Sequence, residues 1–179
     1  MKQKNGVVMS PALFLDRDGV INKDNGYTHI WTDHILITGI VELIRRYRKI
    51  NYKIIVITNQ SGIGRGYYSD AAFHLFMENM EKELERCGAK IDHYYYCGCD
   101  PSKTKCLNRK PMPGLFLKAT VENNIKLKES IMVGDNITDL VAAHRAGVPS
   151  LYLFDELNNF QVEYETEFRY NIVEKLREI

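Results

Sequence analysis

Two aspartates, Asp16 and Asp18, stand two residues apart at the end of an apolar run and just before Gly19. In an extended chain alternate side chains point to the same side, so both carboxylates face one way and Arg17 faces the other. Two neighbouring carboxylates repel each other unless a cation joins them or one of them is protonated. The pair therefore predicts a Mg²⁺ site at which the two acids have different roles. The other interpretation is a strand end followed by a polar turn.

A second polar group follows a second apolar run: Thr58, Asn59, Gln60 and Ser61, with glycines at 62, 64 and 66. Hydroxyl, amide and main-chain N–H groups at the end of a strand are typical phosphate ligands. The segment lacks the Gly-Lys-Ser/Thr sequence of a P-loop, so a flexible turn is the alternative interpretation. Arg65, between two of the glycines, either contacts an anionic substrate or faces water.

A third acid, Asp135, ends another apolar strand as Asp16 ends the first. Carboxylates from neighbouring parallel strands can share one divalent ion. Asp139, four residues later, is interpreted as a helix cap, as a residue that orients the surroundings of Asp135, or as a favourable charge at a helix N-terminus.

Two adjacent cations, Arg109 and Lys110, precede Pro111. An arginine can grip a phosphate or hydroxyls with its planar fork, whereas a lysine acts as a point charge. Adjacent cations also occur on solvated surfaces, so the other interpretation is an exposed pair that contacts only water.

The elements that must position these residues alternate along the chain. Apolar runs rich in β-branched or aromatic residues recur at 12–16, 53–58, 91–97, 130–135 and 150–154, with helical patterns between most of them. This alternation predicts an α/β fold: a doubly wound, mostly parallel, Rossmann-like sheet of five or six strands with helices on both faces. The four polar groups then fall at or near the carboxyl ends of strands, where open α/β sheets bind ligands.

Helical periodicity predicts the buried faces of four helices. Their apolar positions are Ile40, Leu43, Ile44 and Tyr47; Phe73, Phe76, Met77, Met80 and Leu84, after Ser69 as N-cap; Leu115, Leu117, Ala119 and Val121, after Pro113; and Ile137, Leu140, Val141 and His144, before Gly147. Residues 22–35 are expected to form a small hairpin or flap over the strand ends. In the tail, Tyr164, Phe168, Ile172, Leu176 and Ile179 have helical spacing and predict a last helix.

Length and composition predict one domain over 1–179, with a core of about 11–154 and a helical tail of about 155–179. The chain has 179 residues, 45% of them hydrophobic, and a net charge of +1. No basic stripe indicates nucleic acid as a partner. No apolar run reaches the length of a membrane span, and residues 1–6 do not lead into a signal-peptide core, so we expect a cytoplasmic monomer without a membrane partner.

In order, the motifs Asp-x-Asp-Gly-Val, Thr-Asn-Gln-Ser-Gly, Lys-Pro and Val-Gly-Asp-x-x-x-Asp resemble the four motifs of the haloacid dehalogenase phosphohydrolase superfamily. Within it, the sequence from about Leu13 to Phe154 most resembles the D-glycero-D-manno-heptose-1,7-bisphosphate 7-phosphatase family. That resemblance implies a capless domain and the removal of the 7-phosphate from the heptose bisphosphate, in the biosynthesis of nucleotide-activated heptose for lipopolysaccharide. Histidinol-phosphate phosphatase is the alternative enzyme, and a non-catalytic phosphosugar-binding protein is the alternative outside catalysis.

The resemblance also implies a role for each motif. Asp16 is expected to attack phosphorus and form an aspartyl-phosphate, and Asp18 to act as acid and then as base. Asp16, the main-chain carbonyl of Asp18 and Asp135 are expected to hold Mg²⁺. Thr58 and Lys110 are expected to stabilise charge on the phosphoryl group. The residues expected to bind substrate are Asp24, Asn25, Gly26, Tyr27, Asn59, Gln60, Ser61, Arg109 and Asn136.

Three of the four cysteines, Cys97, Cys99 and Cys106, cluster within ten residues. In a reducing compartment such a cluster suggests a metal sooner than disulfides, and the resembling family has a zinc loop here. Three thiolates suit zinc, but Asn108 stands at the fourth ligand position, so a closed site needs Asp100, His93 or water. A zinc-free loop with buried thiols is the other interpretation.

Overall fold

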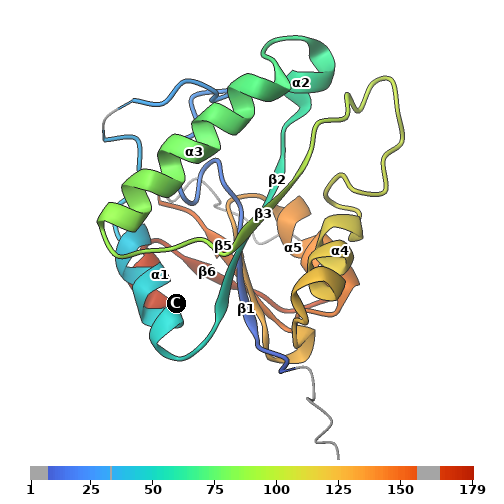
Figure 1. The fold of residues 1–179 in the computed structure, drawn as a ribbon. Helices are drawn as coiled ribbons and strands as arrows, with labels where there is room; N and C mark the ends of the chain where they lie inside the picture. Colours follow the sequence, from blue (N-terminus) through green and yellow to red (C-terminus); the bar gives the residue numbers. More distant parts are fainter. Residues whose placement is uncertain (1–7, 33, 157–165) are drawn as a thin grey trace, which may run out of the picture.

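The computed structural model describes residues 8–32, 34–156 and 166–179. In these residues one sheet of parallel strands has the order β3-β2-β1-β4-β5-β6 (Figure 1). Its strands are β1 (Ala12–Leu15), β2 (Lys53–Asn59), β3 (His93–Cys97), β4 (Ile131–Gly134), β5 (Ser150–Phe154) and β6 (Asn171–Val173). The predicted parallel α/β fold is confirmed. The strand order reverses between β1 and β4, and such a switch point is where open α/β sheets bind ligands.

Helices cover both faces of the sheet, as predicted. The helices are α1 (Ile40–Lys49), α2 (Ser61–Arg65), α3 (Asp70–Arg86), α4 (Gly114–Asn123) and α5 (Ile137–Ala146), with short 3-10 turns η1 (Leu127–Glu129) and η2 (Leu176–Glu178). In Figure 1, α1 and α3 lie on one side of the sheet and α4 and α5 on the other. The apolar residues of the two pairs belong to two separate core clusters.

Strand β1 lies between the two clusters and contributes side chains to each of them. Leu13 and Leu15 face α1 and α3, whereas Phe14 faces the other side, where its ring lies 5.0 Å from that of Phe116. Because both faces are buried, the strand is apolar at every position. The first residue after it, Asp16, is therefore held by a rigid strand at the carboxyl end of the sheet.

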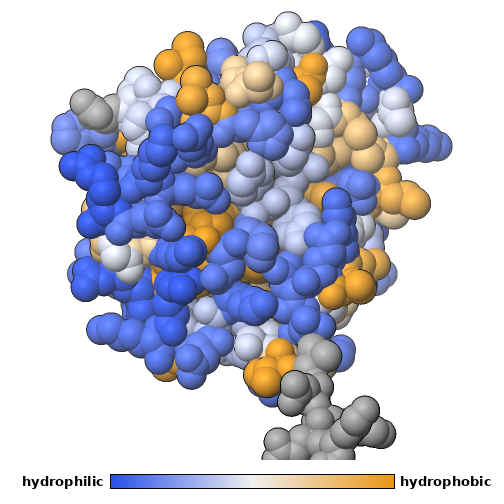
Figure 2. All heavy atoms as spheres, viewed as in Figure 1, coloured by the Kyte–Doolittle hydropathy of each residue, from blue (hydrophilic) through white to orange (hydrophobic). Residues whose placement is uncertain are grey.

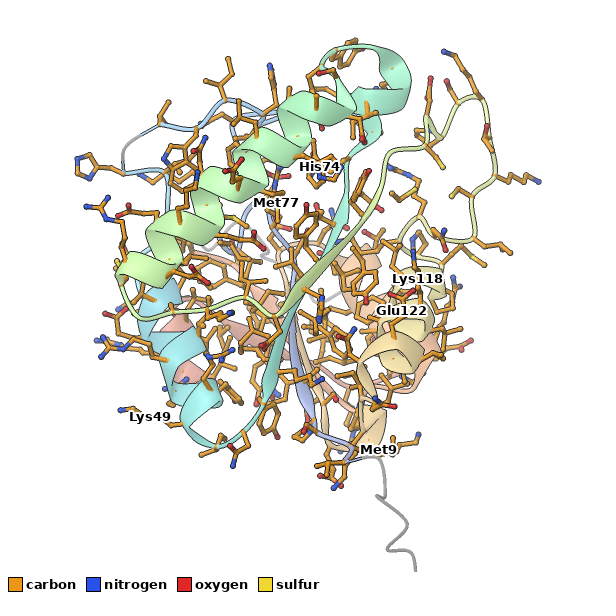
Figure 3. All side chains as sticks on the ribbon, viewed as in Figure 1. Met9, Lys49, His74, Met77, Lys118 and Glu122 are labelled. Atoms are coloured by element: carbon orange, nitrogen blue, oxygen red, sulfur yellow. The ribbon has the colours of Figure 1, made fainter. Side chains whose placement is uncertain are left out.

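The helix boundaries follow the predicted signals. Ser69 caps α3 by accepting a hydrogen bond from the Ala72 N–H at 3.1 Å. Figure 3 shows His74 and Met77 on this helix; Met77 is buried against the sheet, and the His74 ring forms a 2.9 Å hydrogen bond with the Tyr94 hydroxyl. For α3 and α1 the predicted apolar faces are confirmed.

On α4 the predicted apolar face is wrong in part. Leu115 and Ala119 are buried, but Leu117 and Val121 are 46% and 79% exposed, and Phe116 is buried instead. Residues two positions apart lie on different sides of a helix, because the helical repeat is 3.6 residues. The alternating pattern of apolar residues therefore could not define one face.

The predicted C-terminal helix is wrong over residues 166–179. Ile172 lies in β6, which pairs with β5 through Tyr152, Leu153 and Phe154, and Leu176 lies in η2. A strand edge leaves N–H and C=O groups unpaired, and β6 satisfies those of β5. Leu176 is buried in the cluster beneath α1, and the Tyr47 hydroxyl donates to the Ile179 carbonyl at 3.0 Å. Tyr164 lies outside the described residues.

Residues 22–32 and 34–35 belong to a loop closed at its base, in agreement with the predicted flap. Asn22 and Leu36 make an isolated antiparallel bridge, and the Lys23 N–H donates to the Ile35 carbonyl at 2.9 Å. We call residues 22–32 the flap below. The face of the molecule in Figure 2 is largely hydrophilic, with scattered hydrophobic side chains. Among the described residues, no helix combines the length and apolar character that a bilayer crossing requires.

Candidate active site

A pocket of about 380 Å³ opens where the carboxyl ends of β1, β2 and β4 meet. It contains all the predicted catalytic, magnesium and substrate residues except Asn25. Its lining is Asp16, Asp18, Asp24, Gly26, Tyr27, Thr58, Asn59, Gln60, Ser61, Tyr68, Arg109, Lys110, Asp135, Asn136, Thr138 and Asp139. Three of these, Tyr68, Thr138 and Asp139, were not predicted as site residues. The four motifs therefore meet in one place, as their order at strand ends predicts.

Three carboxylates gather at the switch point. Oxygen atoms of Asp16, Asp135 and Asp139 all lie within 4.8 Å of one another. Gly19 permits this approach, because its φ is +77° and an added Cβ would lie 2.0 Å from Oδ2 of Asp135. The loop after β1 can therefore pass directly beside the end of β4.

Burial raises the pKa of Asp16 well above its ordinary value; Lys110 opposes this shift, and the charges of Asp139 and Asp135 add to it. Burial likewise raises the pKa of Asp135 to about 7, and Asp139 contributes to the shift. Two such acids ionise together at neutral pH only when a cation compensates them. Since carboxylate oxygens are the ligands that Mg²⁺ prefers, the donor set of Asp16 and Asp135 fits this ion.

Lys110 neutralises part of this charge. Its Nζ is buried and has three acceptors: Oδ1 of Asp139 at 2.7 Å, the Ile57 carbonyl at 2.8 Å and Oδ1 of Asp16 at 2.9 Å. Burial alone would lower the pKa of Lys110, but Asp139 and Asp16 together raise it above its ordinary value. An ammonium group has three N–H donors, so every donor of Lys110 is used.

The amide of Asn59 fixes the backbone of Lys110. Its Oδ1 accepts from the Lys110 N–H and its Nδ2 donates to the Lys110 carbonyl, both at 3.1 Å. The motif after β2 therefore holds the third motif in place. Asn59 was predicted to bind substrate, and these contacts give its amide a second task.

Asp139 combines two roles. Its Oδ2 accepts from the Asn136 N–H at 3.1 Å and so completes a capping box at the start of α5, while its Oδ1 pairs with Lys110. The side chain of Asn136 closes the box: its Oδ1 accepts from the Thr138 N–H at 3.0 Å and from the Thr138 hydroxyl at 2.9 Å. Of the interpretations left open, the cap is confirmed, and the ion pair with Lys110 adds to it.

Asp18 is held by three side chains. Arg17 Nη2 reaches its carboxylate at 2.7 Å, Asn22 Nδ2 at 2.9 Å and Gln60 Nε2 at 2.9 Å. Arg17 is fully buried, and its guanidinium lies 4.5 Å from the ring centre of Phe76. Sequence reasoning placed Arg17 on the side away from the acids and gave it no role. The signal that could have found it is a charged residue flanked by buried positions immediately after an apolar strand.

Gln60 joins the acid to the strand β2. Its Nε2 also donates to Oγ1 of Thr58 at 2.9 Å, and its Oε1 accepts from the Tyr68 hydroxyl at 2.5 Å. Both ends of the amide are used, and the side chain is buried. Burial raises the pKa of Tyr68 to about 12, so this hydroxyl stays a donor. Gln60 therefore fixes the positions of Thr58 and Asp18.

The glycines after Ser61 do not form an open phosphate loop. Residues 61–65 are helix α2, and none of the three glycines lines the pocket. An added Cβ at Gly62 would lie 2.1 Å from Cε1 of Tyr68, and one at Gly64 would lie 2.5 Å from the Asp100 nitrogen. Gly62 and Gly64 are needed for close packing, which the sequence pattern could not distinguish from phosphate binding.

Arg109 lines the pocket, and one of its donors is unsatisfied. Within the described part of the chain, its Nη1 is buried and has no hydrogen-bond partner. A buried guanidinium N–H without an acceptor is costly, so a ligand oxygen would satisfy it. This agrees with the predicted contact between Arg109 and the substrate.

The three clustered thiols converge. Sulfur atoms of Cys97, Cys99 and Cys106 lie within 4.8 Å of one another. The Cys99 thiol and the N–H groups of Asn108 and Arg109 lower the pKa of Cys106, whereas burial raises that of Cys97 to about 12. Such a trio supplies three of the four ligands of a tetrahedral zinc site.

Two predicted candidates for a fourth zinc ligand, His93 and Asp100, do not face the thiols. His93 stands at the opposite end of β3 from Cys97, about 13 Å away by strand rise. The Asp100 carboxylate accepts from the Ser102 N–H at 3.0 Å and from its hydroxyl at 2.8 Å. Neither residue therefore presents a ligand to the thiols in this arrangement.

Comparisons with known proteins agree with this geometry. A family model of haloacid dehalogenase-like hydrolases matches residues 9–147, which include the whole pocket. The D-glycero-alpha-D-manno-heptose-1,7-bisphosphate 7-phosphatase of Campylobacter jejuni is 43% identical over 145 residues, which are 81% of this chain and 83% of that protein. The D-glycero-beta-D-manno-heptose-1,7-bisphosphate 7-phosphatase of Vibrio cholerae is 42% identical over 144 residues, 77% of each chain. The crystal structure of D,D-heptose 1,7-bisphosphate phosphatase from B. bronchiseptica, complexed with magnesium and phosphate, has a TM-score of 0.80 and 28% identity, covering 93% of both chains.

Proposed function

This chain belongs to the haloacid dehalogenase-like hydrolase family, and from that premise we propose that it hydrolyses the 7-phosphate of D-glycero-D-manno-heptose 1,7-bisphosphate. The product is the heptose 1-phosphate, an intermediate of nucleotide-activated heptose biosynthesis. The observation that carries the proposal is the convergence of Asp16, Asp18, Thr58, Lys110 and Asp135 in one pocket.

The reaction proceeds in two steps on two acids. A carboxylate oxygen of Asp16 forms a bond to phosphorus while the bond from phosphorus to the C7 oxygen breaks, and Asp18 gives its proton to that oxygen. A water then attacks phosphorus, Asp18 takes the proton of that water, and the bond to Asp16 breaks to release phosphate. The contacts of Asp18 with Arg17 and Gln60 keep its carboxylate at the pocket in both steps.

Charge in the pocket is arranged for a phosphoryl group. Lys110 and the Thr58 hydroxyl lie in the pocket next to Asp16, as donors that stabilise negative charge on the transferring group. Asp16, Asp135 and the main-chain carbonyl of Asp18 would hold Mg²⁺, which neutralises charge on phosphoryl oxygens when bound. The B. bronchiseptica relative, with magnesium and phosphate in its crystal structure, supports this ion.

The sugar lies between the flap and the third motif. Asp24, Gly26 and Tyr27 of the flap line the pocket, as does Arg109, whose Nη1 is unsatisfied. A pocket of this size falls in the range of small-molecule sites, about 300–1,000 Å³. Asn59, Gln60, Ser61 and Asn136 complete the lining. Asn25 does not line the pocket, but its N–H donates a hydrogen bond to the Thr28 hydroxyl oxygen at 3.0 Å, so it shapes the flap.

We infer that Cys97, Cys99 and Cys106 bind a structural Zn²⁺ with water as the fourth ligand, because their sulfurs already converge. Elemental analysis of protein purified without chelators should give one zinc per chain, and a Cys97→Ser variant should give less. Absence of zinc from the unchanged protein would favour the alternative of a metal-free loop.

We further propose a cytoplasmic monomer without nucleic-acid partners, since the chain has a net charge of +1 and no basic stripe.

A phosphate-release assay tests the function. We expect Mg²⁺-dependent turnover of either anomer of the heptose 1,7-bisphosphate to exceed turnover of histidinol phosphate, and Asp16→Asn to abolish it. A preference for histidinol phosphate would replace the substrate assignment. No turnover of any phosphomonoester would leave a phosphosugar-binding protein as the explanation.

A further inference from the structure

Arg65, at the end of α2, contacts two loops that the mechanism above treats separately. Its Nη1 donates to the hydroxyl of Tyr27 at 2.6 Å, and its Nε lies 3.7 Å from Oδ1 of Asp100. Tyr27 belongs to the flap, whereas Asp100 follows Cys99 in the cysteine loop, residues 97–106. Figure 1 shows these segments and α2 at the same end of the sheet. Arg65 therefore bridges the flap and the cysteine loop.

The cysteine-loop end of this bridge is firmly held. Asp100 is buried, and Ser102 donates two hydrogen bonds to its Oδ1. The backbone of α2 also contacts this loop, because the Gly64 N–H donates to the Gly98 carbonyl at 2.9 Å. A side chain at Gly64 would collide with this backbone, at 2.6 Å from the Gly98 oxygen. The position of Arg65 relative to Asp100 is thus fixed by main chain as well as by charge.

The flap end depends on its neighbours. Tyr27 has a φ of 53°, which is uncommon for a residue with a side chain, and it is 41% exposed. Its ring packs edge-on against Tyr67 at 4.7 Å, and its hydroxyl is bound by Arg65. Tyr27 lines the pocket, but Arg65 does not. The orientation of a pocket residue is therefore set by a residue that does not reach the pocket itself.

We propose that Arg65 is a positioning residue, which ties Tyr27 at the pocket to Asp100 in the cysteine loop and so keeps the flap in its substrate-binding position. The proposal rests on the proposed function insofar as Tyr27 contacts the sugar. When only a fraction of molecules hold the flap in place, apparent substrate affinity falls by that fraction. The chemistry at Asp16 is left intact, so the effect falls on KM.

A lysine cannot replace this bridge. The two contacts use different nitrogens of one rigid guanidinium, Nη1 toward Tyr27 and Nε toward Asp100. The single ammonium of a lysine is a point charge and would serve one partner at a time. Arg65→Lys is therefore expected to resemble Arg65→Met, although it keeps the charge.

The kinetic test uses Arg65→Met, Arg65→Lys, Tyr27→Phe and the double variant Tyr27→Phe with Arg65→Met, with Arg86→Met as a matched control on the exposed end of α3. On the heptose bisphosphate, Arg65→Met should raise KM by about three- to tenfold, the worth of one exposed charged hydrogen bond, while kcat stays within about twofold. The double variant should be no worse than the worse single variant. Equal loss in kcat, or multiplication of the two single effects, would overturn the proposal.

A second measurement is independent of the substrate. Hydrogen exchange of flap residues 22–32, followed by mass spectrometry, should be faster in Arg65→Met than in the unchanged protein and in Arg86→Met. Unchanged exchange would refute the bridge even if the enzyme hydrolyses the heptose bisphosphate. Faster exchange in a protein without that activity would retain the bridge and remove the substrate assignment.

Discussion

Replacing Lys110 by methionine tests the charge arrangement of the pocket most severely. The change keeps most of the apolar side chain and removes only the ammonium. It leaves three buried acceptors without their donor: the carboxylates of Asp16 and Asp139 and the Ile57 carbonyl. We expect both folding stability and phosphatase activity to fall.

The magnitude follows from what is left behind. Removing one partner of a buried ion pair costs about 3–5 kcal/mol, because the remaining charge is buried without compensation. Typical domains are stable by about 5–15 kcal/mol, so Lys110→Met should fold but unfold at clearly lower urea concentration. Lys118→Met is the matched control: Lys118 is exposed on α4, 4.0 Å from Glu122 (Figure 3), and its loss should cost less than about 1 kcal/mol.

The folding stability that Lys110→Met loses should depend on pH. Lys110 has a raised pKa and stays charged in both the folded and the unfolded state between pH 5 and 8, so its own titration adds no slope there. Asp16 has a raised pKa, and the folded state therefore binds more protons than the unfolded state, so its contribution weakens stability as pH rises. Removing Lys110 raises that pKa further. The deficit of Lys110→Met should thus be larger at pH 8 than at pH 5, by about 1.4 kcal/mol for each added unit of pKa.

The assay is urea denaturation in the presence of a chelator, so that no divalent ion compensates the carboxylates. Adding Asp139→Asn to Lys110→Met removes one orphaned charge, so the double variant should be more stable than the sum of the single losses by about 1–3 kcal/mol. Additive losses together with a deficit that does not change with pH would refute the reasoning.

Three other substitutions test separate parts of the account. Asp135→Asn should raise the Mg²⁺ concentration for half-maximal activity by about 100-fold or more, since even outer-shell changes cost about 10–100-fold; an unchanged Mg²⁺ titration would remove Asp135 from the metal site. Arg17→Met should lower stability by about 3–5 kcal/mol in urea, because Asp18 loses its buried partner, and should lower kcat as Asp18→Asn does; normal stability would contradict that pairing. Leu176→Ala should cost about 2–5 kcal/mol, since Leu176 is buried beneath α1; a loss under 1 kcal/mol would show that the C-terminal turn packs weakly.

The positions of the acids could be predicted from the sequence because the carboxyl ends of parallel strands lie at the same end of the sheet. Asp16 and Asp135 both terminate apolar runs, and this alone placed them together once the sheet was parallel. The contact of Lys110 with Asp139 could not be predicted from the sequence, because it depends on the path of a loop between β3 and α4.

Two of the errors, the C-terminal helix and the missed role of Arg17, have a common physical origin in tertiary context. Ile172 and Leu176 have helical spacing, but the same residues also suit an edge strand followed by a turn, and the open edge of β5 decided between them. Arg17 carries a charge that composition rules place on the surface, yet Asp18 and the ring of Phe76 compensate its burial. In both cases a partner distant in the sequence, strand β5 or the ring of Phe76, contributes to the outcome.

The central claim is that Asp16 carries the phosphoryl group during turnover. Rapid acid quench during hydrolysis of the heptose bisphosphate traps the intermediate. Reduction with borohydride then converts a phosphorylated aspartate to homoserine, and peptide mass spectrometry locates the homoserine in the sequence. The account predicts homoserine at position 16, and none in protein quenched before substrate is added. Phosphate release with residue 16 unmodified, or with homoserine at another aspartate, would contradict it.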